Sequence, residues 1–413
     1  MEPAKYLTLD SVKRDFMEKF AVSGAITEKA SAYIPAGFSR SIASYGPHAI
    51  FVDHGEGQYV YTVDGHQLLD FHSNFGCNTL GHNHPAIREA LQEAVPRGFS
   101  FGCPMAHEHK LAQLLVERIE SLEQLIFTCS ASEACLVAVR TARAYTGKPK
   151  LAKLEGGFHG IADDFQVSIQ PRPLHMAGDP SDPLCVPCAG GLAPHTLADA
   201  VVLPQNDLEA CERILRAQAH DLACLIMELQ PGAGGLVELD RDFVRGLRDI
   251  TKALGIVLIA DETITLRCAY AGLQGEYGIS PDLTVMGKII GGGLPLGALG
   301  GRKDIMALIG SGQVKHSGTH HGHPLATAAG IACMEVMTPE VYARLTAYGA
   351  RIRDELNRWA AEHDHPFLVS GRGSFLGYEV ADRPGLTYRS VRDLVAHSDE
   401  EAMQIVALEF ANR

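Results

Sequence analysis

The sequence lacks any apolar run that approaches the roughly 20 residues needed to span a bilayer. It also lacks an N-terminal signal pattern, because Met1 leads into a mixed polar stretch. Acidic residues outnumber basic ones, and the formal net charge of −13 argues against a nucleic-acid-binding surface. We therefore expect a cytoplasmic protein that binds neither membrane nor nucleic acid.

A disulfide framework is also missing. The ten cysteines are scattered, and Cys185 and Cys188 form the only close pair. With His175 and His195 nearby, this pair could be read as a zinc site, but no second cysteine pair completes the pattern. We favour a reduced loop pair, as is usual in the cytosol, and predict no metal.

Short apolar strands alternate with amphipathic helices through the middle of the 413-residue chain. One helix is predicted over 240–254, with Gly255 as its stop. The alternation predicts an α/β fold with a mostly parallel sheet covered by helices on both faces, in which ligands bind at the strands' carboxyl ends. The predicted strands are 125–128, 151–154, 224–227, 256–260 and 283–286.

The two ends of the chain do not show this regular alternation of strands and helices. A helix is predicted over 9–20 and a hairpin over 59–65, whereas a long helix (339–359), a strand (375–380) and a last helix (398–411) predict a smaller α+β lobe at the other end. The predicted core face of the long helix is Val341, Leu345, Tyr348, Ile352 and Leu356. The predicted domains are an N-terminal segment of the small domain (1–60), a large domain (61–325) and a C-terminal small domain (326–413).

Lys288 is the most informative residue. It follows the apolar strand 283–286 and precedes the glycines 291–293, while another apolar strand ends on Asp261. A lysine and an acid at the ends of buried strands form the minimal constellation for pyridoxal phosphate: the amine condenses with the cofactor's aldehyde, and the carboxylate keeps the pyridine nitrogen protonated. The alternative is that Asp261 caps a turn and Lys288 pairs with a buried carboxylate.

A helix start follows the predicted strand 125–128. Ser130 and Glu133 have capping-box spacing, and the small residues Ala131 and Ser132 leave room for an anion at the exposed N–H groups. Taken alone, this is equally a well-capped helix.

Several motifs together resemble the class III pyridoxal-phosphate aminotransferases of fold type I, most closely glutamate-1-semialdehyde aminomutase and the β-phenylalanine (β-amino acid) aminotransferases. The resemblance covers about 30–380 and implies a seven-stranded, mostly parallel sheet with a smaller α+β domain built from both termini. The matching stretches, in family order, are 80–85, 130–134, 155–160, Asp261 with Glu262, 287–293 and 317–319.

The resemblance also implies roles for single residues. Lys288 and Asp261 would be catalytic, Phe158 would stack on the cofactor ring, and Thr319 would reach the phosphate in the neighbouring subunit of a homodimer. Glu228 matches a family acid near the ring hydroxyl, although a strand-end charge with a local hydrogen bond explains it nearly as well. The implied cofactor-binding residues are Ser130, Ala131, Ser132, Phe158, Glu228, Asp261, Thr263, Lys288 and Thr319.

Four departures from the family pattern stand out. Phe158 replaces a usual tyrosine, Thr263 a usual aliphatic residue and Ala131 a usual glycine, and none of these removes an essential group. The sequence also stops at Arg413, before further strands that the family carries, so either the small domain is abbreviated or the sequence ends early.

The resemblance points to three substrate residues. Arg40 matches an arginine that binds the substrate carboxylate, Phe75 an aromatic pocket wall, and His320 a position beside Thr319. The alternatives are a surface arginine, a core aromatic and a histidine that forms hydrogen bonds at a subunit boundary.

We expect an aminotransferase that acts on a carboxylate-bearing amino acid or amine and a keto acid or aldehyde. An aminomutase of the glutamate-1-semialdehyde type is the alternative, but the predicted long loop over 171–194 lacks the Ser-Pro-Gly stretch of that enzyme's gating loop. A catalytically silent cofactor-binding protein is the third interpretation.

Overall fold

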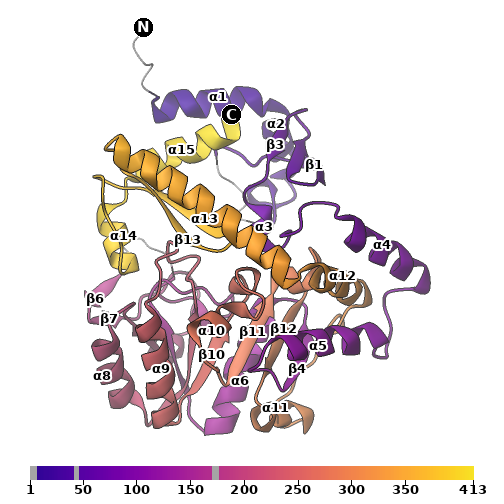
Figure 1. Cartoon of the computed structure of the whole chain (residues 1–413), viewed down its shortest axis with the longest axis vertical. Helices are drawn as coiled ribbons and strands as arrows, with labels where there is room; N and C mark the ends of the chain where they lie inside the picture. Colours follow the sequence, from indigo (N-terminus) through magenta and orange to yellow (C-terminus); the bar gives the residue numbers. More distant parts are fainter. Residues whose placement is uncertain (1–6, 41–45, 170–175) are drawn as a thin grey trace.

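The computed structural model describes residues 7–40, 46–169 and 176–413. A seven-stranded sheet forms the centre of the lower lobe in Figure 1. Strand β12 pairs antiparallel with both neighbours and the other neighbouring strands pair in parallel, which confirms the predicted α/β fold. In spatial order the strands are β4 (Gln124–Thr128), β12 (Gly297–Gly301), β11 (Leu283–Gly287), β10 (Val257–Asp261), β9 (Leu222–Glu228), β5 (Lys150–Leu154) and β8 (Ala200–Leu203).

Helices cover both faces of this sheet because successive side chains of a strand point to opposite sides. In β9, Cys224 and Ile226 belong to the apolar core under α6 and α11, whereas Leu225 and Met227 belong to the core under α8, α9 and α10. A third core joins β4 and β11 to α5 and α12. These helices are α5 (Ala106–Arg118), α6 (Ala131–Thr146), α8 (Leu208–Gln218), α9 (Arg241–Leu254), α10 (Gly272–Tyr277), α11 (Lys303–Gly310) and α12 (Pro324–Val336).

All five predicted strands form, as does the helix that ends at Gly255, whose backbone is left-handed. Sequence reasoning missed β8 and β12. The short β12 reads Gly-Ala-Leu-Gly-Gly, a composition that argues against a strand. Its glycines are needed for close packing: a β-carbon on Gly297 would lie 2.4 Å from the backbone of Ser130, and one on Gly301 2.3 Å from the carbonyl oxygen of Asp282.

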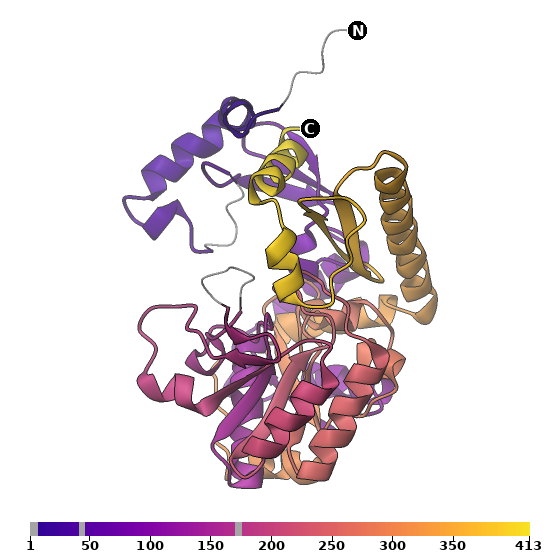
Figure 2. The same cartoon turned by 90° about the vertical axis from the view of Figure 1, so that its left-hand side faces the viewer.

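The upper lobe combines both ends of the chain (Figures 1 and 2). Phe16 packs with Leu408 in one apolar cluster, and Lys19 Nζ donates to the carbonyl oxygens of Ala411 and Asn412 at 3.1 and 2.8 Å. The division into domains at residues 60 and 325 stays a prediction. The lobe contains α1 (Leu9–Lys19), α2 (Ala21–Ala30), β1 (Val52–Glu56), β2 (Tyr59–Thr62), β3 (Gln67–Leu69), α13 (Pro339–Glu362), β13 (Phe367–Arg372), β14 (Phe375–Val380), α14 (Val391–His397) and α15 (Glu400–Asn412).

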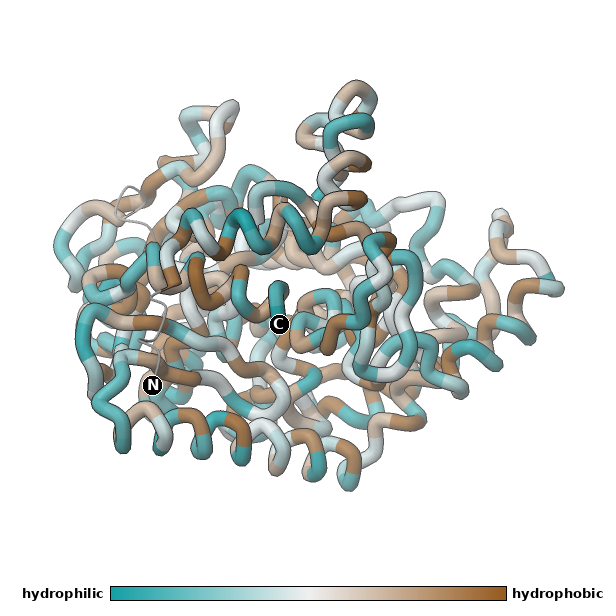
Figure 3. Tube along the Cα trace, turned by 90° about the horizontal axis from the view of Figure 1, so that it is seen from above, coloured by the Kyte–Doolittle hydropathy of each residue, from teal (hydrophilic) through white to brown (hydrophobic). Residues whose placement is uncertain are grey.

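The predicted core face of α13 is wrong in its second half. Tyr348, Ile352 and Leu356 are 53%, 39% and 39% exposed. The inner face is instead formed by small and polar residues: Gly349 and Ala360 are buried, and both the amide nitrogen and the amide oxygen of Asn357 bond to the backbone of Val369 in β13. Hydrophobic and hydrophilic segments are correspondingly interspersed along the helices of this lobe when it is viewed from above (Figure 3).

The segment predicted as a loop over 171–194 contains regular structure. Strands β6 (Ala177–Asp179) and β7 (Asp182–Leu184) form a hairpin, and α7 (Pro194–Asp199) follows. The hairpin forms because the carboxylate of Asp179 accepts both the N–H and the hydroxyl of Ser181 in its turn. Within the described residues, no helix is both long and apolar enough to cross a membrane.

Candidate active site

The carboxyl ends of β9, β10 and β11 meet at one edge of the sheet. Asp261, the last residue of β10, pairs in register with Glu228 of β9 and with Val285 of β11. Lys288 follows β11 directly and has a left-handed backbone, with φ of 51°. Such a backbone is uncommon for a residue other than glycine and occurs most often where function requires it.

Asp261 is a buried carboxylate that is held ionised. Burial alone would raise its pKa, but hydrogen bonds from His159 Nδ1 at 2.9 Å and from the N–H of Thr263 at 3.0 Å outweigh burial, and the pKa of Asp261 is lowered. Burial also lowers the pKa of His159, so the ring is neutral and donates from Nδ1. The thiol of Cys135 lies 3.6 Å from the same carboxylate.

Glu228 is the second buried carboxylate of the site. Burial and the neighbouring charge of Asp261 raise the pKa of Glu228 to about 7. Its two oxygens accept the backbone N–H groups of Phe158 at 2.8 Å and Gly232 at 3.2 Å. Two carboxylates in adjacent strands therefore have pKa values shifted in opposite directions, which is typical of functional sites.

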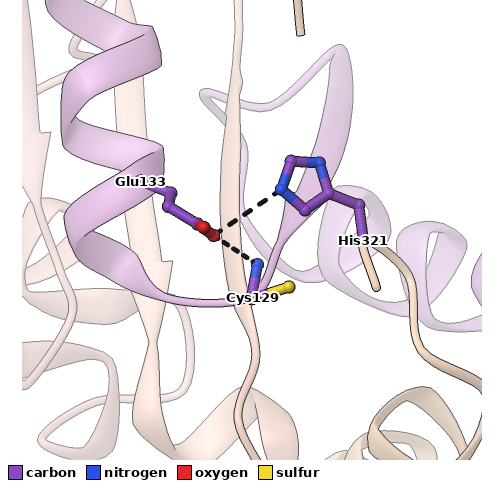
Figure 4. A group of neighbouring side chains, drawn as sticks. All are labelled: Cys129, Glu133 and His321. Carbon is purple, nitrogen blue, oxygen red and sulfur yellow. Dashed lines mark hydrogen bonds and ion pairs between the residues drawn. The ribbon is translucent and has the colours of Figure 1, made fainter. Parts of the chain in front are cut away.

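The start of α6 faces the same space. The Ser130 hydroxyl accepts the N–H of Glu133, and the Glu133 carboxylate accepts the N–H groups of Cys129 and Ser130, so the predicted capping box is present. The same carboxylate lies 3.6 Å from His321 Nε2 (Figure 4). Because the cap fixes the helix start, the N–H groups of Ala131 and Ser132 remain available for an anion.

One cavity of about 550 Å³ brings most of the predicted residues together, a size suited to a cofactor with its substrate. The Thr263 hydroxyl is buried beside it without a hydrogen-bond partner, as expected of a group that completes its bonding with a ligand. These features fit pyridoxal phosphate. The predicted residues that line the cavity are Arg40, Ser130, Ala131, Ser132, Phe158, Glu228, Asp261, Thr263 and Lys288.

Arg40 lies in this lining together with Asn74. Its Nη1 donates to Asn74 Oδ1 at 2.8 Å, and its guanidinium lies 5.6 Å from the centre of the Phe75 ring. Phe75 is therefore close to the cavity through Arg40, although it is not itself among the lining residues.

Thr319 and His320 lie outside this cavity in the described part of the chain. Both line a smaller cavity with Phe99 and Glu108, beside His323. Within one chain, the structure does not bring these two residues to Lys288.

Sequence reasoning missed His159, Cys135 and Asn74. His159 stands next to Phe158 in a motif that was noticed, but its contact with Asp261 joins segments 102 positions apart. No local pattern predicts such a contact. Asn74 precedes Phe75 in the sequence, but its bond to Arg40 joins segments 34 positions apart.

Two groups of potential metal ligands converge within the described residues: Cys129 with Glu133 and His321, and Cys135 with His159 and Asp261. In both groups the carboxylate is already hydrogen-bonded to the protein. Cys185, Cys188 and His195 belong to neither group, and His175 lies outside the described residues.

Comparison with known families identifies the chain. The family model for class-III aminotransferases matches residues 41–405. The chain belongs to the class-III aminotransferase family. Enzymes of this family use pyridoxal phosphate, and the chain is a pyridoxal-phosphate-dependent enzyme of fold type I.

Curated relatives of this class-III enzyme include glutamate-1-semialdehyde 2,1-aminomutase 1 from Staphylococcus carnosus, 37% identical over 86% of this chain and 82% of the relative. The aminomutase 2 from Geobacillus kaustophilus is 35% identical over 96% and 91% of the two chains. The likeness thus extends over most of both proteins.

Similar solved structures include enzymes named as transaminases and enzymes named as aminomutases. An omega-transaminase from Sphaerobacter thermophilus is 36% identical with a TM-score of 0.84, covering 91% of this chain and 84% of the other. A β-phenylalanine aminotransferase from Variovorax paradoxus is 32% identical with a TM-score of 0.88, covering 98% and 89%. A glutamate-1-semialdehyde-aminomutase from Pseudomonas aeruginosa PAO1 is 26% identical with a TM-score of 0.87, also covering 98% and 89%, and a variant of it was solved in complex with PMP.

Proposed function

We propose that this class-III enzyme is an aminotransferase that moves an amino group between a carboxylate-bearing amino acid or amine and a keto acid or aldehyde. One observation carries the proposal: a lysine amine, an ionised buried carboxylate and a helix start with free N–H groups line a single cavity. These are the three anchors that a phosphorylated pyridine aldehyde requires.

Each residue has a role in the proposal. Pyridoxal phosphate supplies an aldehyde that takes up the amino group and a protonated ring that withdraws electrons from the substrate carbon. Asp261 keeps the ring nitrogen protonated, and His159 holds the carboxylate ionised and in place. The N–H groups of Ala131 and Ser132 bind the phosphate, and Phe158 covers one face of the ring.

Lys288 anchors the aldehyde end and then moves the proton. With the cofactor held there and a substrate amine bound, Lys288 Nζ would be free to act as the base that takes the proton from the substrate carbon and as the acid that gives it back. Arg40, which also lines the cavity, binds the donor carboxylate through its planar pair of N–H donors.

An aminomutase is the second candidate, because curated relatives at 35–37% identity carry that name. We favour transfer between two molecules, since the chain lacks a Ser-Pro-Gly stretch in the segment where β6 and β7 form a short hairpin. An aminomutase must hold its substrate through the whole reaction, and a gating loop serves that purpose.

The test is incubation of the cofactor-loaded enzyme with candidate donors and no acceptor, followed by the absorbance of the bound cofactor. An aminotransferase converts one equivalent and stops until a keto acid is added. Repeated turnover of glutamate-1-semialdehyde without an acceptor would support the aminomutase, and absence of any change across the donors would support a silent protein. Lys288→Ala is expected to abolish the conversion, and retention of the full rate by that variant would contradict the mechanism.

A further inference from the structure

A left-handed turn contributes Asn74 to the lining of the cavity. The φ angles of Ser73, Asn74, Phe75 and Gly76 are 48°, 49°, 54° and 87°, so four consecutive residues are left-handed and three of them are not glycine. Left-handed backbone is unfavourable for side-chain-bearing residues and rarely extends beyond single positions. Strain of this kind persists only where the surroundings impose it, and it concentrates at functional sites.

Asp70 holds the turn in place. Its Oδ1 accepts the N–H groups of His72 and Ser73, both at 2.9 Å, and its Oδ2 lies 2.7 Å from His82 Nε2. Gly76 completes the turn, because a β-carbon there would lie 2.7 Å from Arg267 Nη1. Asp70 therefore holds the start of the turn, and backbone bonds from the N–H groups of Cys77 and Asn78 to the carbonyl oxygens of Asn74 and Ser73, at 3.2 and 3.1 Å, close it.

The fixed turn presents Asn74 to Arg40. Asn74 Oδ1 accepts the bond from Arg40 Nη1 at 2.8 Å, and both residues line the cavity. Arg40 is exposed, so burial does not hold its long side chain. Because guanidinium has five N–H donors, one bond to Asn74 fixes its direction and leaves other donors for a carboxylate.

We propose that Asn74 is a positioning residue: the left-handed turn uses it to aim Arg40 into the cavity, and this sets the preference for carboxylate-bearing ligands. The inference rests on the proposed function for the identity of the site, and it adds the residue that makes the site selective. Fixing the guanidinium beforehand lowers the entropy lost when a carboxylate binds.

Asn74→Gly is the cleanest variant, because glycine adopts the same φ without strain and only the side chain is lost. Titration calorimetry of the cofactor-loaded protein with 3-phenylpropanoate, a carboxylate without an amine, is expected to show a roughly tenfold higher Kd, because the freed Arg40 side chain must then be ordered when the carboxylate binds. The matched control is Asn83→Gly, which also replaces a left-handed asparagine (φ of 52°) but lies outside this cavity, and its Kd is expected to stay at the wild-type value.

A kinetic comparison supplies the second readout. With Asn74→Gly, the ratio of kcat/KM for a carboxylate-bearing amine to that for an amine without a carboxylate is expected to fall about tenfold, through KM rather than kcat. An unchanged Kd and an unchanged ratio would overturn the proposal, as would a wild type that does not bind 3-phenylpropanoate. Failure of the proposed function is distinct, since it is seen as the absence of any donor half-reaction in the wild type.

Discussion

At the scale of single residues, the site depends on two carboxylates that differ in protonation although they end neighbouring strands. Asp261 receives hydrogen bonds from a neutral histidine and a backbone N–H, which favour its charged form. Glu228 also accepts two N–H groups, but burial and the charge of Asp261 outweigh them. The same edge of the sheet thus carries one fixed negative charge, on Asp261, and one carboxyl group, on Glu228, that titrates near neutral pH.

The raised pKa of Glu228 predicts a pH-dependent stability of the cofactor-free protein. Between the usual value of 4.5 and about 7, the folded chain keeps a proton that the unfolded chain releases, so the free energy of unfolding falls as pH rises through this window and then levels off. Urea unfolding at pH 5.5 and pH 8 is expected to show that Glu228→Gln removes about 2 kcal/mol of the difference between the two pH values.

The matched control for this prediction is Glu209→Gln, at an exposed position in the first turn of α8, which is expected to retain the wild-type difference. A Glu228→Gln protein whose stability changes with pH as strongly as that of the wild type would show that Glu228 does not hold the extra proton.

Sequence reasoning at this scale succeeded where chemistry follows directly from local pattern. Lys288, Asp261 and the helix start at Ser130 each stand at the end of a recognisable strand. The supporting contacts from His159, Cys135 and Asn74 could not be predicted, because they depend on how distant segments meet in space. The left-handed turn that carries Asn74 likewise has no signature in its sequence beyond Gly76.

At the scale of elements, segments with a strong hydrophobic period were predictable, whereas a short glycine-rich strand was not. Helix α9 has a regular apolar face and a glycine stop, and it forms as expected. Strand β12 is glycine-rich because α6 and β11 approach it closely. Its composition is therefore determined by this close packing and not by a preference for strand structure.

Helix α13 shows a different limit. Its apolar spacing predicts a core face, but in its second half β13 contacts the adjacent face, which carries Asn357, and Tyr348, Ile352 and Leu356 remain exposed. Periodicity locates the helix correctly but cannot say which neighbour it meets.

At the scale of the whole molecule, we propose that a homodimer completes the site, with Thr319 reaching the phosphate bound by the partner. Thr319 lies outside the cavity that contains Lys288 of the same chain, which agrees with a role in the other subunit. The segment that carries it is close to the start of α6 through His321 and Glu133 (Figure 4).

Mixed dimers test this arrangement. Lys288→Ala and Thr319→Ala proteins are each expected to have low activity, but a dimer with one chain of each contains one site with both an intact lysine and an intact threonine. Refolding the two variants together is therefore expected to restore activity toward half of the wild-type value per mixed dimer, whereas mixing without subunit exchange restores none. No recovery in verified mixed dimers would indicate that Thr319 acts within its own chain.

The central claim is that Lys288 is the amine that carries the cofactor in the cavity completed by Asp261. Borohydride reduction of the pyridoxal-phosphate-loaded protein, followed by peptide mass spectrometry, tests it most directly. The expected result is one reduced phosphopyridoxyl group per chain, on the peptide that contains Lys288. A label on another lysine, such as the buried Lys153, would contradict the account. So would an Asp261→Ala variant that, after excess cofactor is removed, still carries as much label at Lys288 as the wild type.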